Sequence, residues 1–115
     1  MTRLLNIIFL FIFLFNHTVK AQDKESHFIL TSDKVKLYTK KSGKGPIAIF
    51  IHGGPGAWST SFENLGGNKL ESDLTMVYYD QRGSGYSGNS SEGNYSPDRM
   101  IEDIEDIRKQ YGAEK

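Results

Sequence analysis

The chain has 115 residues, a length that suits one small domain and is short for a two-domain enzyme. Its 14 basic residues balance 14 acidic ones and do not cluster along one face, so a nucleic-acid partner is not expected. Because the sequence has no cysteine, disulfide bonds, a thiolate nucleophile and a cysteine-based zinc site are excluded.

The first 21 residues have the layout of a signal peptide. Arg3 precedes an apolar run from Leu4 to Phe15, and Val19 and Ala21 supply aliphatic or small groups before a cleavage point. The run is shorter than the roughly 20 apolar residues that a membrane-spanning helix needs. We therefore expect cleavage after Ala21, export to the periplasm or the medium, and no stable membrane span in the mature protein.

The mature chain is expected to begin with a flexible polar terminus, residues 22–26, followed by one folded domain, residues 27–115. Within this domain, the runs 28–31 and 35–38 flank a Ser-Asp-Lys turn and predict a β-hairpin. A loop is expected at residues 40–46. The apolar run that follows, Ile47–Ile51, is typical of a central parallel strand buried on both faces.

A second apolar strand is predicted at Leu74–Tyr79. Residues 58–70, between the two strands, suit a short helix interrupted by Gly66-Gly67. Strand, helix and strand in this order predict a βαβ unit, in which the two strands are parallel.

A last helix is predicted from Pro97 to Gln110, with Ser96 as its N-cap. Its apolar residues recur at helical spacing and define one face: Met100, Ile104, Ile107 and Tyr111, with Ile101 beside them. Its acidic residues are expected on the opposite, solvated side, where they have no histidine partner for a metal site: Glu102, Asp103, Glu105 and Asp106. Neither a metal ion nor a cofactor is expected.

A glycine-rich segment, His52-Gly53-Gly54-Pro55-Gly56, follows the first apolar strand. Catalytic and ligand-binding loops of open α/β sheets lie at the carboxyl ends of their strands. Glycines let the backbone bend sharply and bring its N–H groups close to a reacting oxygen, as in the oxyanion hole of a hydrolase. The sequence therefore predicts an oxyanion-binding loop here, the alternative being a plain glycine and proline turn.

The second strand ends in the loop Asp80–Gly88, with the sequence DQRGSGYSG. Gly83–Gly88 satisfies G-x-G-x-x-G, which makes nucleotide binding a minor alternative function. That pattern requires its last glycine inside a helix, whereas the predicted helix starts only near Pro97. Ser84 and Ser87 do not stand in the G-x-S-x-G elbow of a serine nucleophile, so both are interpreted as polar loop residues.

Asp80 and Arg82 flank the turn of this loop. One interpretation makes Asp80 a catalytic acid, and the favoured one is a structural ion pair or a backbone anchor. The planar guanidinium of Arg82 can hold several carbonyls or a carboxylate at once, which suits a residue that fixes a loop beside a site.

Together, His52–Gly56 and Asp80–Gly85 resemble, in order and spacing, the loops of the prolyl aminopeptidase (proline iminopeptidase) branch of the α/β-hydrolases. The resemblance runs from about His27 to the end of the chain. It implies the amino-terminal portion of an α/β-hydrolase, with a hairpin, a βαβ unit and a further helix, incomplete before the nucleophile strand. Tyr86 departs from the family, where arginine commonly follows the glycine.

The resemblance implies that the backbone N–H of Gly54 is an oxyanion donor and that Gly53 and Gly56 shape the loop. It leaves open a cis peptide bond before Pro55. Residues expected to support the site are His52, Pro55, Asp80, Arg82, Gly83 and Gly85. The chain has no positions that match the serine elbow, the catalytic acid and base, or the acids that bind a peptide's free amine.

The expected function is therefore that of an amino-terminal fragment of an exported serine hydrolase, which cleaves peptide or ester bonds by acyl transfer and is inactive alone. A small peptide or ester is the expected substrate once the missing half is supplied. The alternative is a non-catalytic fragment or a small binding module. In the implied fold the third strand neighbours the fifth, so an uncovered apolar edge is expected at Ile47–Ile51.

Overall fold

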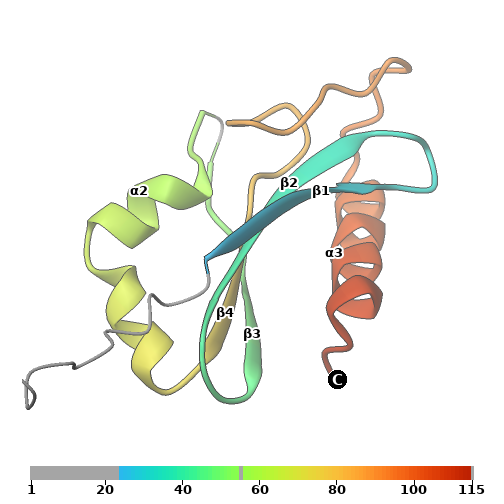
Figure 1. Ribbon diagram of the computed structural model, residues 1–115. Coiled ribbons are helices and arrows are strands. Elements are labelled where there is room, and N and C mark those ends of the chain that lie inside the picture. Colours follow the sequence, from blue (N-terminus) through green and yellow to red (C-terminus); the bar gives the residue numbers. More distant parts are fainter. Residues whose placement is uncertain (1–23, 55, 115) are drawn as a thin grey trace, which may run out of the picture.

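The computed structural model describes residues 24–54 and 56–114, so the expected signal peptide, its cleavage point and Pro55 lie outside the described residues. The described residues form a mixed four-stranded sheet with helices on both sides (Figure 1). The strands are β1 (Glu25–Leu30), β2 (Lys36–Gly43), β3 (Ile47–Phe50) and β4 (Thr75–Tyr79). The helices are α2 (Ser59–Asn64), the 3-10 helix η1 (Gly67–Ser72) and α3 (Pro97–Tyr111).

The hairpin predicted around residues 32–34 is confirmed, with β1 antiparallel to β2 along its whole length. Thr31 closes the turn, because its hydroxyl oxygen accepts the backbone N–H of Val35 over 3.0 Å. β1 already begins at Glu25. Glu25 and Ser26 therefore lie in a strand and not, as expected, in a flexible terminus, because ladder pairing with β2 orders them.

β2 is longer than expected, since its second half pairs antiparallel with β4. The loop expected at residues 40–46 is correspondingly shorter. Polar side chains in this stretch face partners in the helical layer. Lys40 forms an ion pair with Glu63 of α2, and the Ser42 hydroxyl donates to Glu71 of η1 over 2.7 Å. Their polarity therefore marks buried contacts and not a loop.

β3 and β4 are parallel neighbours, which confirms the predicted βαβ unit. The strand order is β1-β2-β4-β3, so β3 lies at an edge of the sheet formed by the described residues. Ile47 and Ile51 are 36% and 51% exposed. The interpretation of Ile47–Ile51 as a central strand buried on both faces is thus wrong for this part of the chain, because only β4 pairs with β3. The uncovered edge, also expected from the sequence, is present.

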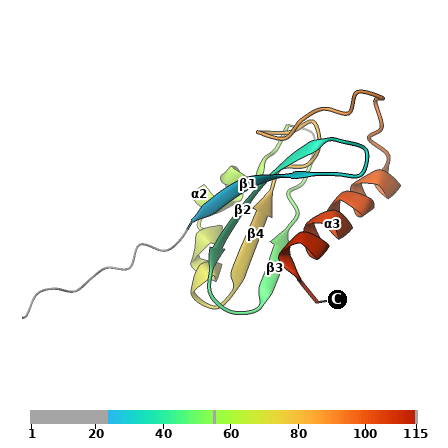
Figure 2. The ribbon, with the colours of Figure 1, turned by 45° about the vertical axis from the view of Figure 1, so that its right-hand side comes forward.

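Helices cover opposite faces of the sheet, with α3 on one face and α2 with η1 on the other (Figure 2). Under α3 the core consists of buried apolar side chains: Ile29, Val35, Leu37, Val77, Tyr79 and Ile107. On the other face the ring of Phe50 stacks on that of Phe62, with centroids 3.9 Å apart. The alternation of side chains along β4 sets this division, since Tyr79 joins the core and Tyr78 donates its hydroxyl to Glu71 of η1.

α3 confirms the last predicted helix and extends it by one residue. The Ser96 hydroxyl caps it by accepting the backbone N–H of Arg99 over 3.2 Å. The expectation that all its acidic residues are solvated is wrong for Asp103, which is 2% exposed. Asp103 lies one turn before the fully buried Ile107, so the two residues share a face. No helix of the described residues is long and apolar enough to cross a membrane.

Candidate functional site

Two loops meet at the carboxyl ends of β3 and β4, which are adjacent parallel strands. We call residues 52–58 the glycine loop and residues 80–88 the Asp80 loop. Their proximity follows from the sheet, because the carboxyl ends of parallel strands lie at the same edge. The structure therefore brings the sequence-predicted site residues together at one end of the molecule, with Pro55 and the bond before it outside the described residues.

His52 begins the glycine loop and is buried. Its Nε2 accepts the backbone N–H of Gln81 over 2.9 Å. Because a ring nitrogen that accepts carries no proton, we assign the proton of the neutral ring to Nδ1, which donates to the carbonyl of Gly53 over 3.1 Å. The side-chain amide of Gln81 donates in return to the His52 carbonyl. His52 thus joins the ends of β3 and β4 through Nε2 and its own backbone carbonyl, while Nδ1 bonds within the glycine loop.

Asp80 holds the other end of the glycine loop and is fully buried. One carboxylate oxygen accepts both the backbone N–H and the hydroxyl of Ser59, each over 2.8 Å. The second oxygen accepts the backbone N–H of Tyr86 over 3.0 Å. Ser59 is the first residue of α2, so Asp80 also satisfies an N–H that the helix itself leaves free. The carboxylate therefore binds the backbone at the start of α2, directly after the glycine loop, and the backbone of its own loop.

Gly85 allows the Asp80 loop to wrap closely around this carboxylate. Its φ is +50°, and a Cβ at this position would lie 2.2 Å from Oδ2 of Asp80 and 3.1 Å from Cβ of Trp58. No side chain fits in that space. The Asp80 loop therefore needs glycine here for conformation and for room.

The Asp80 loop closes on itself. The backbone N–H of Gly83 donates to the carbonyl of Gly88 over 2.9 Å, and the Ser87 hydroxyl donates to the Asp80 carbonyl. α3 starts only at Pro97. The loop therefore lacks the helix N-terminus that dinucleotide-binding loops place against a phosphate, and Ser87 is a structural loop residue.

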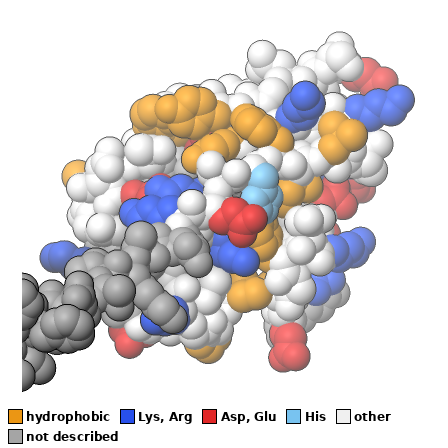
Figure 3. Space-filling view, viewed as in Figure 1, with side chains coloured by type: hydrophobic (Ala, Val, Ile, Leu, Met, Phe, Trp, Pro, Cys, Tyr) orange, Lys and Arg blue, Asp and Glu red, His pale blue; other side chains and the backbone are white. Residues whose placement is uncertain are grey.

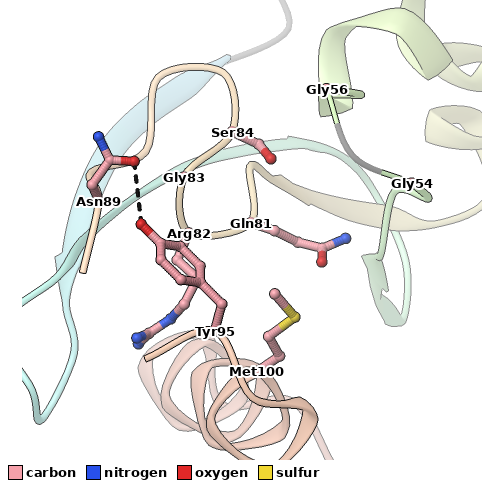
Figure 4. A pocket seen from close by; sticks show the side chains of 9 residues that line it. All are labelled: Gly54, Gly56, Gln81, Arg82, Gly83, Ser84, Asn89, Tyr95 and Met100. Atoms are coloured by element: carbon pink, nitrogen blue, oxygen red, sulfur yellow. Dashed lines mark hydrogen bonds between the residues drawn. The ribbon is translucent and has the colours of Figure 1, made fainter. Parts of the chain in front are cut away.

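The side chain of Arg82 points away from Gly54 (Figure 4), and all five N–H groups of its guanidinium donate hydrogen bonds. Two donate to Asp103 over 2.7 and 2.8 Å, two to Asp33 over 2.9 and 3.0 Å, and one to the carbonyl of Asn94 over 2.8 Å. The hydrogen bonds to Asp103 and Asp33 raise the pKa of Arg82 above its ordinary value. The ion pair considered between Asp80 and Arg82 is not formed, because each side chain binds other partners.

Arg99 completes a cluster of two arginines and two aspartates in which only Asp33 is partly exposed. It donates to Asp103 over 3.0 Å and lies 3.8 Å from Asp33. We call Asp33, Arg82, Arg99 and Asp103 the Arg82 cluster. Of these four residues, sequence analysis had named only Arg82 as a residue that supports the site. The positions of Arg99 and Asp103 could have predicted a buried ion pair, since the two residues lie four apart on the helix face that Ile107 occupies. No local sequence pattern indicates the role of Asp33.

The two loops and the start of α3 border a cleft of about 440 Å³ (Figure 4). Its lining residues are Gly54, Gly56, Gln81, Arg82, Gly83, Ser84, Asn89, Tyr95 and Met100. A Cβ on Gly53, Gly54 or Gly56 would meet no heavy atom within 4 Å, so the glycine loop faces open space. Among the described residues no acceptor binds the N–H of Gly54. Among residues 24–54 and 56–114, no group of three His, Asp or Glu side chains is placed to hold a metal ion.

Aromatic side chains connect the glycine loop to the hairpin. The rings of Phe28 and Tyr38 lie 5.8 Å apart, those of Tyr38 and Tyr86 5.1 Å, and those of Tyr86 and Trp58 5.6 Å. Figure 3 shows hydrophobic side chains gathered over β2 and the loop that follows β4. Tyr86, which departs from the resembled family, connects Tyr38 of the hairpin to Trp58 of the glycine loop.

Comparison with known proteins identifies the family. Residues 46–115 match the family model described as alpha/beta hydrolase fold. The chain belongs to this family, and the fold class predicted from the sequence is confirmed.

Three known proteins illustrate the relationship. The chain is 37% identical over 62 residues to the probable aminopeptidase YbaC of Bacillus subtilis (strain 168), a match of 52% of this chain and 20% of the relative. It is 30% identical over 98 residues to protein phosphatase methylesterase 1 of Candida albicans, or 80% of this chain and 27% of the relative. The solved esterase EaEST from Exiguobacterium antarcticum superposes with a TM-score of 0.68 at 28% identity, covering 77% of this chain and 32% of the esterase. The chain thus spans at most about a third of these proteins.

Proposed function

We propose that this chain carries the oxyanion-binding loop of a hydrolase that cleaves peptide or ester bonds by acyl transfer. The observation that carries the proposal is that Gly54 lines an open cleft and that no acceptor among the described residues binds its N–H. The loop around it is fixed at both ends by hydrogen bonds from the Asp80 loop. A donor that is fixed before the reaction stabilises a developing negative charge without having to reorganise.

In this reaction a serine hydroxyl attacks the scissile carbonyl carbon and the carbonyl oxygen becomes an anion. The N–H of Gly54 donates to that oxygen. Collapse of the tetrahedral intermediate expels the amine or alcohol, and water then releases the acid from the acyl-serine. His52 is not the general base, since both its ring nitrogens are engaged within the two loops. No serine of the sequence stands in G-x-S-x-G, so we assign the role of nucleophile to none of them.

Within this class we propose an aminopeptidase of the prolyl aminopeptidase type. The paired loops His52–Gly56 and Asp80–Gly85 support it, as does the identity with the probable aminopeptidase YbaC. Ester hydrolysis is the second candidate, because the match to the methylesterase covers more of the chain. We further propose export, with residues 1–21 removed as a signal peptide.

A chimera tests the role of Gly54. Residues 24–115 replace the matching segment of the EaEST esterase, and an α-hydroxy acid replaces Gly54 so that an ester oxygen stands in place of its N–H. We expect kcat for a nitrophenyl ester to fall about 10²–10³-fold with little change in KM. The same replacement at Gly93, whose N–H donates to the Ser90 carbonyl in an exposed loop, is the control. An unchanged kcat overturns the proposal.

Three further checks support this test. Co-expression of the chain with the rest of the esterase as separate polypeptides repeats it where the fusion does not fold. The 115-residue chain alone should show no turnover. Serine-dependent turnover by this chain would show that one of its own serines is the nucleophile. A G-x-S-x-G elbow encoded shortly after codon 115, in any frame, is expected for the enzyme, and its absence favours a non-catalytic fragment or binding module.

A further inference from the structure

We infer that Asp103 is a positioning residue for the glycine loop and that it acts through Arg82. The inference rests on the proposed function, because it assigns Asp103 to the geometry of the loop that presents Gly54. Asp103 lies on α3 and is not itself among the residues that line the cleft, but it binds Arg82, which is. Its influence must therefore pass through a defined chain of contacts.

The first link is the pair of neighbours Asp80 and Gln81. Gln81 binds His52 at the start of the glycine loop, and Asp80 binds Ser59 at its end. Adjacent residues of one loop thus fix both ends of the other. A displacement of the Asp80 loop would move the two ends together and carry Gly54 with them.

The second link is Arg82, the next residue along the chain. Its guanidinium has no free donor, and its side chain has no exposed surface. Asp103 is 2% exposed and accepts two of the five bonds, whereas Asp33 accepts two from a position that is 26% exposed. In Asp103→Asn an NH2 donor replaces one accepting oxygen, so one buried N–H of Arg82 loses its acceptor and faces another donor. Water can satisfy that N–H less readily at this position than beside the more exposed Asp33. Arg82 then moves toward water and pulls Gln81 away from His52.

The tautomer of His52 distinguishes positioning from general stabilisation. While Gln81 donates to Nε2, the neutral ring carries its proton on Nδ1. Once that bond is lost, either nitrogen can carry the proton. A cluster that only stabilised the fold would leave the tautomer of the folded protein unchanged.

The experiment records nitrogen chemical shifts of ¹⁵N-histidine in the folded full-length chain at about pH 8, where an ordinary imidazole is neutral. In the unmodified protein we expect His52 as the Nδ1-protonated form. Asp103→Asn should convert it to a mixture of both tautomers. Asp106→Asn is the matched control, because Asp106 lies on the same helix and binds Arg99 over 3.3 Å without contacting Arg82. His27, bonded to the Tyr111 hydroxyl over 2.8 Å, is the internal reference.

A folded Asp103→Asn protein that keeps the Nδ1-protonated form overturns the inference. Where Asp103→Asn does not fold, Asp33→Asn is used instead, because it removes the more exposed partner of Arg82. It should change the tautomer of His52 in the same direction but by less. An unchanged tautomer in Asp33→Asn likewise overturns the inference.

The chimera separates this inference from the proposed function. Asp103→Asn should lower its kcat about 10- to 100-fold with KM unchanged, and Asp106→Asn should not. A changed tautomer with full kcat would refute the oxyanion role of Gly54 while positioning stands. An unchanged tautomer refutes positioning whatever the replacement at Gly54 shows.

Discussion

The backbone N–H of Gln81 lies 2.9 Å from Nε2 of His52, and this hydrogen bond ties the ends of two parallel strands together. His52 is therefore a structural hydrogen-bond acceptor and not the general base that a histidine beside this loop suggests. The chemistry that remains available in the glycine loop is that of its backbone. The shape of that backbone, and therefore whatever keeps the two loops in register, is the property to test.

Arg82→Ala should lower the free energy of unfolding by about 3–5 kcal/mol, because it leaves Asp103 as a buried charge without its main partner. Urea unfolding at neutral pH measures the change. Arg108→Ala is the control, since Arg108 pairs with Glu105 near the surface of the same helix and should contribute no more than about 1 kcal/mol. Similar losses in the two variants would contradict the prediction.

Asp33 should make stability depend on pH in the acid range. Hydrogen bonds from Arg82 and Thr31 hold the pKa of Asp33 well below its ordinary value of 3.8. An acid whose pKa is lower in the folded state stabilises the fold fully at pH values above its unfolded pKa, and this contribution declines as the pH falls toward the folded pKa. Asp33→Asn lacks it at every pH.

The difference in unfolding free energy between the unmodified protein and Asp33→Asn should therefore be constant from about pH 5 to 7 and shrink below about pH 4. Urea titrations at a series of pH values give this difference directly. A difference that grows on acidification would mean that the sign is wrong.

Gly85→Ala should be far more damaging than Gly93→Ala, although both glycines have positive φ, +50° and +67°. A left-handed conformation alone costs alanine about 1–2 kcal/mol, and this is the whole effect expected at Gly93, where no atom lies within 4 Å of the new Cβ. At Gly85 the methyl group collides with the Asp80 carboxylate, which adds about 1–3 kcal/mol. Thermal or urea unfolding compares the two. Equal losses would show that Asp80 can move away from Ser59 at little cost.

Export predicts a defined amino terminus. Mass spectrometry of the protein recovered from the periplasm or medium should show a chain that begins at Gln22, because Ala21 offers a small side chain next to the cleavage point. Ala21→Ser keeps a small residue and should be processed, whereas Ala21→Arg should remain uncleaved. Recovery of both variants at full length in the cytoplasm would refute the proposal.

The strands and helices follow from local patterns in the sequence. The apolar run Leu74–Tyr79 and the helical spacing from Pro97 onward specify their elements because each pattern is complete within a few residues. The stretch Lys40–Ser42 misled for the opposite reason. Its polar side chains predict a loop, because their partners Glu63 and Glu71 lie more than twenty residues away in the sequence and only the fold brings them together.

For the candidate site, the position of the loops was predictable from the sequence and the contacts that fix them were not. Glycine spacing at the ends of two apolar strands was enough to predict that the loops at His52 and Asp80 meet. The fixing of those loops was not predictable, because a buried polar side chain reveals its role only through its partner. Arg82 illustrates this, since it binds Asp33, a residue 49 positions earlier in a hairpin turn whose sequence predicts only a turn.

Three consecutive residues, Asp80 to Arg82, bind the start of α2, the end of β3, the hairpin turn and α3. These contacts join positions 21 to 49 residues apart, so each must close a long segment of chain before it can form. We therefore expect the glycine loop to gain its shape late in folding, after the hairpin has formed and the helices on both faces of the sheet have docked. It is also the first part to lose its shape when any one of them detaches. The proposed oxyanion donor would therefore be absent from a partly folded chain until the last of these elements is in place.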